Sequence, residues 1–418
     1  MYIKELTNEE FESFSYEFEP SSFYQSKEYA SVMNRQGFTS LLVGLIDDYN
    51  KLVAASLILV EKINGFSYAY APRGFLINYS DYELVKNFTN HIKRYLGKKG
   101  IMAIKLSPMI IKNVKDKNNN LVQINSNYDN IFKNLIQNGY YHFGYNNFFE
   151  ALRPRFEAVL DLSLPYYLLF KNFKKETRTK IRSAVKNGIH IYKGSRDDLK
   201  YLHFQTKDKY PRDLKYFEDC YDVMNDDKKI EFYYTKLNTE EFLIKTKKEY
   251  EKLEYENSIL NRDFLNNKDE KKSTKLLNKK LESDKLVNSC KKRLIKATNL
   301  LRDYPDGVVT ASLLIAIHNK NVYLLIDGYN KKLKELNSKH LLIWSLIEKY
   351  TKEGYEKFYF GGISNPSIKN EHYDGLNTFK LNFNTLVYEY IGDLELVTNN
   401  ALYFMYRNAV PIRGILKK

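Results

Sequence analysis

The chain has 418 residues and a formal net charge of +15 at pH 7, and 43% of its residues are hydrophobic. This length predicts two or three domains with cores of their own. The positive charge favours a polyanionic partner such as RNA, anionic lipid or a pyrophosphate-bearing substrate. The two cysteines, Cys220 and Cys290, stand far apart, which excludes a disulfide framework and a cysteine-based metal site.

Neither a signal peptide nor a membrane span is expected. Residues 1–18 carry acidic side chains throughout, unlike the basic start of a secretory signal. The longest apolar runs, residues 53–60 and 311–317, are too short to cross a bilayer. We therefore expect a cytoplasmic protein, with room for peripheral contact at the inner face of the membrane.

Residues 1–150 are predicted to form a first α/β unit, because strands alternate with helices. Thr7 and Glu10 have the spacing of a capping box at the start of the first helix. Arg73 stands in the turn Tyr70–Gly74, where it suits a structural ion pair and an anion contact equally well. The other expected helices cover residues 23–36, 81–98 and 127–138, and the expected strands cover residues 40–46, 52–62, 66–71 and 103–106.

Residues 151–238 are predicted to begin a second α/β unit, with a first strand over residues 158–162. A cation-rich helix follows, in which Lys174, Arg178 and Arg182 share one face at i, i+4 and i+8. Such a face can bind phosphate groups, or it can simply be solvated. Further helices are expected over residues 199–208 and 219–224, and a strand over residues 230–237.

Residues 239–301 contain neither proline nor glycine and repeat with a period of seven. Leu243, Tyr250 and Phe264 follow this spacing on the way out, and Val287, Leu294 and Leu301 follow it on the return, with a break at residues 266–269. The pattern predicts an antiparallel coiled-coil arm of two helices, each about 40 Å long at 1.5 Å per residue. A dimerisation element or a spacer would have the same pattern.

The second unit is expected to resume over residues 302–395. A strand pair covers residues 308–318 and 321–326, and a helix over residues 337–352 carries Trp344. An aromatic strand over residues 358–360 ends at Gly361 and Gly362, which let a ligand approach the backbone closely.

The last segment of interest is Phe379–Phe383, which is predicted to be a strand because apolar residues alternate in it. Phe379, Leu381 and Phe383 would share one face, so Lys380 would point to the other. Lys380 would then be either a solvated residue of a strand or a cation beside the glycine-lined cleft, where it could stabilise an oxyanion.

The motifs of several enzyme classes are missing from the sequence. It contains no recognisable Ser/His/Asp or Cys/His arrangement, no P-loop and no G-x-G-x-x-G segment. The R/Q-x-x-G-x-G/A loop that holds the pyrophosphate of acetyl-CoA is also missing.

Four segments, in order and spacing, resemble the Fem family of peptidoglycan peptidyltransferases: Val322–Leu325, Trp344, Phe360–Ser364 and Phe379–Phe383. The resemblance implies an enzyme that takes an amino acid from aminoacyl-tRNA and adds it to the stem peptide of a peptidoglycan precursor, lipid-linked or nucleotide-linked. It also implies two acetyltransferase-like (GNAT) units, with the coiled-coil arm inserted in the second. The expected limits are 1–150 and 151–238 plus 302–395 for the two units, 239–301 for the arm, and 396–418 for a tail that packs back on the first unit.

The same resemblance implies roles for individual residues. Lys380 would stabilise the oxyanion of the reacting ester, with Phe379 beside it, while the proton of the attacking amine leaves through the substrate or water. Met33 stands where the family has a lysine, so Lys27 or Arg35 would contact the diphosphate of the acceptor instead. Lys209 stands where the family has an arginine for the same diphosphate, and Arg212 follows closely. The remaining substrate contacts would be Tyr323, Tyr329, Arg73, Gly361, Gly362 and Ser364, and the tRNA contacts Lys174, Arg178 and Arg182.

Neither a metal nor a cofactor is implied, since aminoacyl-tRNA is itself the co-substrate. The arm resembles the tRNA-binding arm of seryl-tRNA synthetase. Two other functions fit the same sequence: an aminoacyl-tRNA-dependent transferase that acts on a protein or a small amine, and a tRNA-binding scaffold without catalysis.

Overall fold

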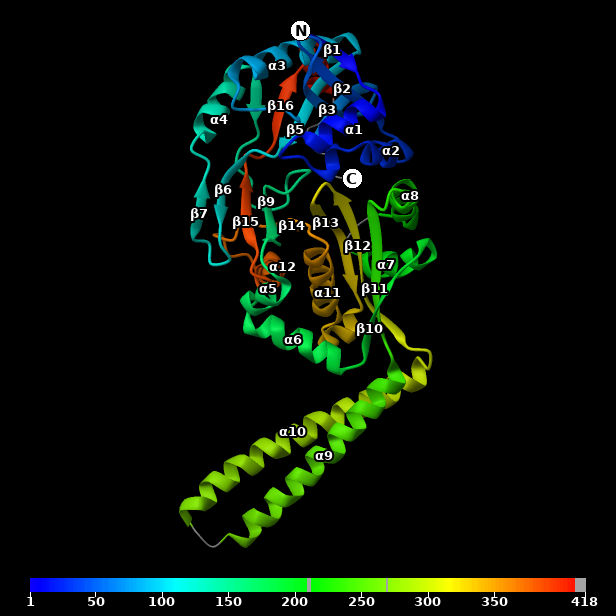
Figure 1. Cartoon of the computed structure of the whole chain (residues 1–418), viewed down its shortest axis with the longest axis vertical. Helices are drawn as coiled ribbons and strands as arrows, with labels where there is room; N and C mark the ends of the chain where they lie inside the picture. The colour runs from blue at the N-terminus through cyan, green and yellow to red at the C-terminus, as the bar shows by residue number, and fades with distance from the viewer. Residues whose placement is uncertain (209–211, 268–269, 410–418) are drawn as a thin grey trace.

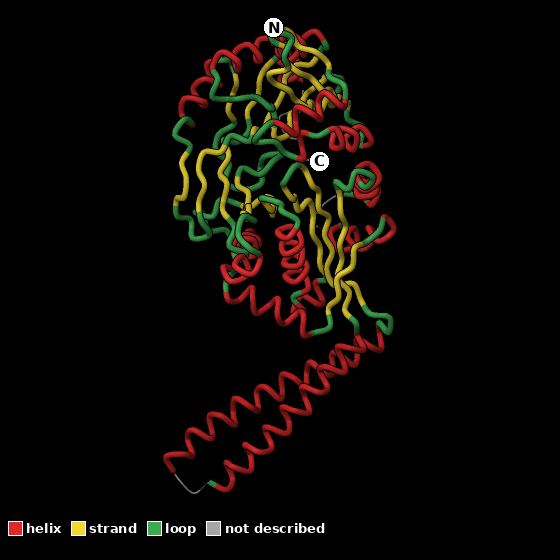
Figure 2. The backbone as a smooth tube through the Cα atoms, viewed as in Figure 1, coloured by secondary structure: helices red, strands yellow, loops and turns green. Residues whose placement is uncertain are grey.

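The computed structural model describes residues 1–208, 212–267 and 270–409 (Figure 1). Two mixed β-sheets with helices packed on them form the body of the molecule, and a long helical hairpin projects from the end that holds the second sheet (Figure 2). The two sheets agree with the two predicted α/β units.

The first sheet has seven strands, in the order β1-β2-β3-β4-β5-β16-β8, and only β4 and β5 pair in parallel. Thr7 caps its first helix and Glu10 completes the predicted capping box. The strands are β1 (Tyr2–Glu5), β2 (Thr39–Ile46), β3 (Leu52–Ile63), β4 (Phe66–Arg73), β5 (Ile101–Pro108), β16 (Leu394–Val397) and β8 (Tyr140–His142). The helices of this part are α1 (Asn8–Glu17), η1 (Phe23–Gln25), α2 (Lys27–Arg35), α3 (Tyr82–Lys98) and α4 (Tyr128–Gln137).

The second sheet has nine strands, in the order β10-β11-β12-β13-β14-β9-β15-β6-β7, and here only β13 and β14 are parallel. Its strands are β6 (Ile111–Lys115), β7 (Leu121–Ile124), β9 (Phe156–Asp161), β10 (Ile189–Lys193), β11 (Ile230–Leu237), β12 (Val308–His318), β13 (Asn321–Tyr329), β14 (Lys357–Ile363) and β15 (Leu386–Tyr390). The surrounding helices are α5 (Tyr166–Asn172), α6 (Lys175–Lys186), η2 (Arg196–Asp198), α7 (Leu199–Thr206), α8 (Leu214–Met224), η3 (Lys331–Leu336), α11 (Ser338–Lys352) and α12 (Glu371–Leu381).

The two sheets exchange strands. β6 and β7, which come from the predicted first unit, lie at the edge of the second sheet, and β16, from the end of the chain, lies between β5 and β8 in the first. The last described helix, α13 (Asn400–Ala409), continues on the same side, where Tyr406 packs against Tyr68 and Met102. The limits of the sheets therefore differ from the limits predicted from the sequence.

The predicted strand Phe379–Phe383 is wrong, because α12 runs through Leu381. Asn370 caps this helix with its side chain. Phe379 and Phe383 are four residues apart, a spacing that also places two rings together at a helix end, and their centroids are 5.5 Å apart. The alternating pattern therefore had a helical alternative.

The hairpin consists of α9 (Thr239–Asn266) and α10 (Glu270–Asp303), which lie side by side and antiparallel between β11 and β12 (Figure 1). At 1.5 Å per residue the helices are about 40 and 50 Å long. Asn257 donates a hydrogen bond to Asp284 across the pair at 3.0 Å, and Arg293 forms an ion pair with Glu249. The two predicted helices are thus in place, while their coiled-coil packing remains a prediction.

The base of the hairpin is embedded in the body. Ala297 and Leu300 of α10 belong to the same hydrophobic cluster as Leu333 and Leu336 of η3. Lys296 adds a hydrogen bond to the Lys332 carbonyl oxygen at 3.2 Å and an ion pair with Glu335.

Among the helices that the structure describes, none is long and apolar enough to cross a membrane.

Arg73 joins the two halves of the body. Its guanidinium is 2.8 Å from Glu157 of β9, donates to the Pro154 carbonyl oxygen at 2.9 Å, and lies 4.4 Å from the ring centre of Tyr390. Only 3% of Arg73 is exposed. Of the two roles that the sequence left open, the structure shows the ion pair, and the anion contact stays a prediction, at a side chain with little exposed surface.

We predict that Glu157→Gln lowers the free energy of unfolding by about 3–5 kcal/mol, because it leaves a buried guanidinium without its counter-charge. Urea unfolding followed by circular dichroism measures the change. Lys320→Gln is the matched control, since the Lys320–Glu356 pair is 70% and 53% exposed and should not affect unfolding measurably. Equal unfolding curves for Glu157→Gln and wild type would contradict the role of Arg73.

Candidate active site

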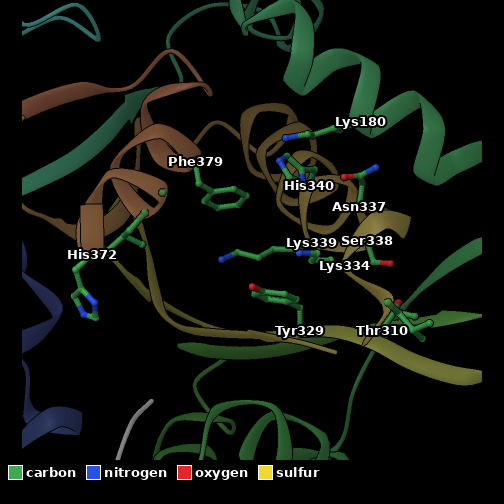
Figure 3. Close-up of a pocket in the computed structure, with 13 residues that line it drawn as sticks. Lys180, Thr310, Tyr329, Lys334, Asn337, Ser338, Lys339, His340, His372 and Phe379 are labelled. Carbon is green, nitrogen blue, oxygen red and sulfur yellow. The ribbon is translucent and has the colours of Figure 1, made fainter. Parts of the chain in front are cut away.

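A cavity of about 460 Å³ lies at one end of the second sheet, bounded by α6, η3, the start of α11 and α12 (Figure 3). Aromatic side chains form part of its wall. The rings of His340 and Phe379 are 5.0 Å apart at a steep angle, and Tyr329 faces them from the end of β13. Apolar rings from three different elements thus meet in one place.

Lys339 crosses the cavity between Phe379 and Tyr329 (Figure 3). Its ammonium nitrogen lies 4.1 Å from the ring centre of Phe379 and 5.8 Å from that of Tyr329, and it forms an ion pair with Asp327 of β13. The cation is therefore held by one carboxylate and two aromatic faces.

Lys380 lies next to this cluster, in the last turn of α12, with 8% of its surface exposed. Its Nζ donates a hydrogen bond to the Gly362 carbonyl oxygen at 2.7 Å. Burial lowers the pKa of Lys380 to about 8. The negative charge of Asp327 raises this pKa, and the positive charge of Lys339 lowers it further. Lys380 is thus not a solvated residue, although it does not itself line the cavity.

Gly361 lies beside Lys380. Its φ of +75° favours glycine, and a Cβ placed there would lie 3.8 Å from Nζ of Lys380, in ordinary contact. Gly361 is half-buried, whereas only 8% of Lys380 is exposed. The structure therefore brings Lys380, Gly361 and Gly362 together, although neither glycine lines the cavity, and the predicted glycine-lined cleft stays a prediction.

Comparison with known proteins identifies the family. The model of the FemAB family matches residues 6–410. The chain belongs to the FemAB family.

Named relatives align with this FemAB protein over nearly their whole length. It is 25% identical to a lipid II:glycine glycyltransferase of Staphylococcus haemolyticus, over 97% of this chain and 95% of that one. It is 28% identical to the aminoacyltransferase FemB of Staphylococcus epidermidis, over all of both chains. The crystal structure of FemX shares the fold, with a TM-score of 0.73 at 21% identity, over 97% of this chain and 99% of that one. The chain is accordingly a transferase of the acyl-transferring class.

Ser364, which the sequence placed among the substrate contacts, is fully buried in this FemAB protein. Its amide donates to Oδ1 of Asn377 at 3.1 Å, and Nδ2 of Asn377 donates to its hydroxyl at 2.9 Å. These bonds tie α12 to the end of β14. Ser364 therefore helps to hold the helix that carries Lys380, and its predicted contact with substrate stays a prediction.

Tyr323 is also in the core. Its ring stacks on Tyr359 at 4.7 Å, and its hydroxyl donates to the Ser21 carbonyl oxygen at 3.4 Å. With 6% of its surface exposed, Tyr323 packs between the halves of the body, and its predicted role at the substrate stays a prediction. Tyr329, six residues on along β13, is the tyrosine that reaches the cavity.

The predicted diphosphate contacts lie elsewhere, around the junction of α2 and α8. Lys27 forms an ion pair with Glu12 at 2.6 Å, and Arg35 lies 3.5 Å from Asp219. Arg212 is exposed, with its guanidinium 4.6 Å from the ring centre of Tyr216. Lys209 lies outside the described residues.

No sequence pattern pointed to Arg153, which lies in an irregular segment before β9. Its guanidinium is 3.5 Å from the ring centre of Tyr24 and donates to the hydroxyl of Tyr29 at 2.7 Å. Both Arg153 and Arg212 act electrostatically on Tyr29, so two guanidinium groups converge on one aromatic cluster. Its aromatic partners come from the distant N-terminal segment, a contact that only the fold reveals.

The three predicted tRNA contacts lie on α6 and at its start. Lys174 and Arg182 are exposed, and Arg178 donates to the Lys171 carbonyl oxygen at 3.1 Å. The cation of α6 that lines the cavity is instead Lys180, which was not predicted. Within residues 1–208, 212–267 and 270–409, no group of three or more His, Cys, Asp or Glu is arranged to hold a metal ion.

His340 provides a direct test of the electrostatics. Burial, followed by the charges of Lys180 and Lys339, lowers its pKa to about 4. We predict that NMR of the ring carbons finds the imidazole neutral down to about that pH, and that Lys180→Gln raises the pKa. Because the unfolded state takes up this proton first, near pH 6.5, the contribution of His340 to stability falls as the pH is lowered from about 6.5 to 4. A ring that titrates near 6.5 in the folded protein would contradict this environment.

Proposed function

We propose that this protein is a tRNA-dependent aminoacyltransferase that adds an amino acid to the stem peptide of a peptidoglycan precursor, with lipid II as acceptor, and so builds the interpeptide bridge. The names of relatives that align over almost the whole chain support this proposal. The observation that carries it is the buried ammonium of Lys380, held at a partly exposed glycine beside a cavity of aromatic and cationic side chains.

The proposed reaction needs little chemistry from the protein. The amine of the acceptor attacks the ester carbonyl of aminoacyl-tRNA, a C–N bond forms, and the C–O bond to the ribose breaks. The proton of the amine leaves through the substrate or water, and the ribose oxygen departs as a hydroxyl. What the site must supply is orientation and a donor for the oxyanion of the tetrahedral intermediate.

Lys380 suits the oxyanion because only part of its hydrogen-bonding capacity is used within the described part of the chain. An ammonium has three N–H donors, and within the described part of the chain Gly362 supplies the one hydrogen-bond acceptor for them. Two donors remain for a substrate oxygen that approaches along Gly361. In a site of low polarity such a contact is worth far more than in water.

The cavity beside Lys380 suits the end of an RNA chain. Phe379 and Tyr329 give the cavity an aromatic wall against which a nucleobase can pack, and Lys339, which lies between the two rings, adds a positive charge. On the other side of the body, Arg153 and Arg212 converge on Tyr29, and we assign the diphosphate of the acceptor to this pair. A lipid-linked acceptor would bring the protein to the inner face of the membrane.

Transfer is tested with the purified protein, a pool of charged tRNA and either lipid II or a nucleotide-linked precursor. We expect mass spectrometry to find the precursor heavier by one amino-acid residue or more, and only when charged tRNA is present. Tight binding of tRNA without a heavier product on either acceptor would favour a scaffold. Transfer to a protein or a small amine, without transfer to either precursor, would favour an aminoacyl-tRNA-dependent transferase with that other acceptor.

Lys380→Ala should lower the transfer rate by about 10²–10³-fold, the usual loss of one oxyanion donor. For the wild type, the rate should fall as the pH rises through about 8, because the pKa of Lys380 is near 8 and only the ammonium donates strongly. Lys380→Arg keeps the charge at high pH, so its residual rate should lack this fall. Circular dichroism controls for folding, and unchanged turnover in Lys380→Ala would reject the role.

Substitutions of the two charged neighbours of Lys380 should shift the pH at which the transfer rate falls, in opposite directions. Asp327 raises the pKa of Lys380 and Lys339 lowers it. Asp327→Asn should therefore shift the fall in rate to lower pH, and Lys339→Met should shift it to higher pH. If either residue had a purely structural role, its substitution would change the rate but not the pH at which the rate falls. A fall at the wild-type pH in both variants would contradict the assignment of this pH dependence to Lys380.

A further inference from the structure

The N-terminus of α11 opens into the cavity, and its own first turn supplies no negative charge to it. The helix has 15 residues, its N-cap Asn337 makes no side-chain capping bond, and its first turn holds no acidic residue. The first amide groups of a helix lack internal acceptors and carry the positive end of the helix dipole. Ser338, Lys339 and His340 of this first turn all line the cavity (Figure 3).

Ser338 provides independent support for a ligand at this place. It is 4% exposed, and its Oγ has no hydrogen-bond partner in the structure although it lies on the cavity wall. A buried hydroxyl without a partner costs about 1–3 kcal/mol. The hydroxyl of Ser338 is thus a donor that an acceptor from outside the chain could satisfy.

The charged side chains that line the cavity here are all lysines. Lys180, Lys334 and Lys339 line the same cavity, and the lining residues, all from the described part of the chain, include no carboxylate. Lys339 is paired with Asp327 and Lys180 with Glu176, whereas Lys334 is exposed and forms no ion pair within the described residues. Helix amides, a hydroxyl and lysines together are the donor set of a phosphate site.

We propose that the start of α11, with Ser338 and Lys334, binds a phosphate group, and that this group is a phosphodiester at the acceptor end of the charged RNA. The inference rests on the proposed function for the identity of the RNA, although the phosphate chemistry itself is independent of it. The His340 amide already donates to the Asn337 carbonyl oxygen at 3.0 Å, so the non-bridging oxygens accept from the amides of Ser338 and Lys339 and from the Ser338 hydroxyl. The adjacent base packs against the aromatic wall of the cavity. The phosphate thereby fixes how far the terminal ester reaches toward Lys380.

Inorganic phosphate is the first probe, because its binding requires no transfer activity. In amide NMR spectra of the whole protein, titration with phosphate should shift the resonances of residues 338–340 at the start of α11. Ser338→Ala should weaken this binding about tenfold, since a hydrogen bond to a charged group is lost. Ser80→Ala, an exposed serine of the first unit, is the control and should bind phosphate as wild type does.

A short RNA with the sequence of a tRNA acceptor end is the second probe. It should displace phosphate from the start of α11, and Lys334→Gln should reduce the salt dependence of its binding by about 0.7 in the slope of log K against log salt, the value for one single-strand phosphate contact. Unshifted resonances at saturating phosphate, or RNA that binds without displacing phosphate, would overturn the inference even if transfer occurs. Phosphate that binds here and is displaced by RNA, in a protein that transfers no amino acid, would leave the site standing and reject the proposed function.

Discussion

The arrangement of the site depends on one buried contact, the hydrogen bond from Lys380 to the Gly362 carbonyl oxygen. Burying an ammonium is unfavourable, and the lowered pKa of Lys380 measures that cost. The carboxylates of Asp327 and Glu157 offset part of it. Because Glu157 also holds Arg73, the charge balance at Lys380 and the joint between the two halves of the body share one residue.

The site divides into two regions, separated by the core of the second sheet. The cavity with Tyr329, Lys339 and Phe379 lies at one end, and the aromatic cluster with Arg153 lies toward the first sheet. Tyr323 and Tyr359 are packed between the halves of the body, which gives a tyrosine that resembles a site residue in sequence a packing role here. Two substrates that bind in these regions would approach Lys380 from different sides.

The sequence predicted local features well, because neighbouring residues determine them. The capping box at Thr7 and the hairpin helices over residues 239–301 follow from spacing alone. The exchange of β16 and β6 between the sheets depends on contacts between residues almost 300 positions apart, which no local pattern encodes. The end of α12 was missed because the spacing of Phe379, Leu381 and Phe383 fits a strand, while that of Phe379 and Phe383 also fits a helix. Arg153 was missed because its partners lie in another part of the chain.

The embedded base of the hairpin has a mechanical consequence. Ala297 and Leu300 share a hydrophobic cluster with Leu333, the residue beside Lys334 on the cavity wall. The base of the hairpin and the rim of the cavity are therefore parts of one packed core, while the rest of a helix about 50 Å long extends into solvent (Figure 1). A partner that bound the far end and displaced the hairpin would disturb the same cluster that shapes the cavity.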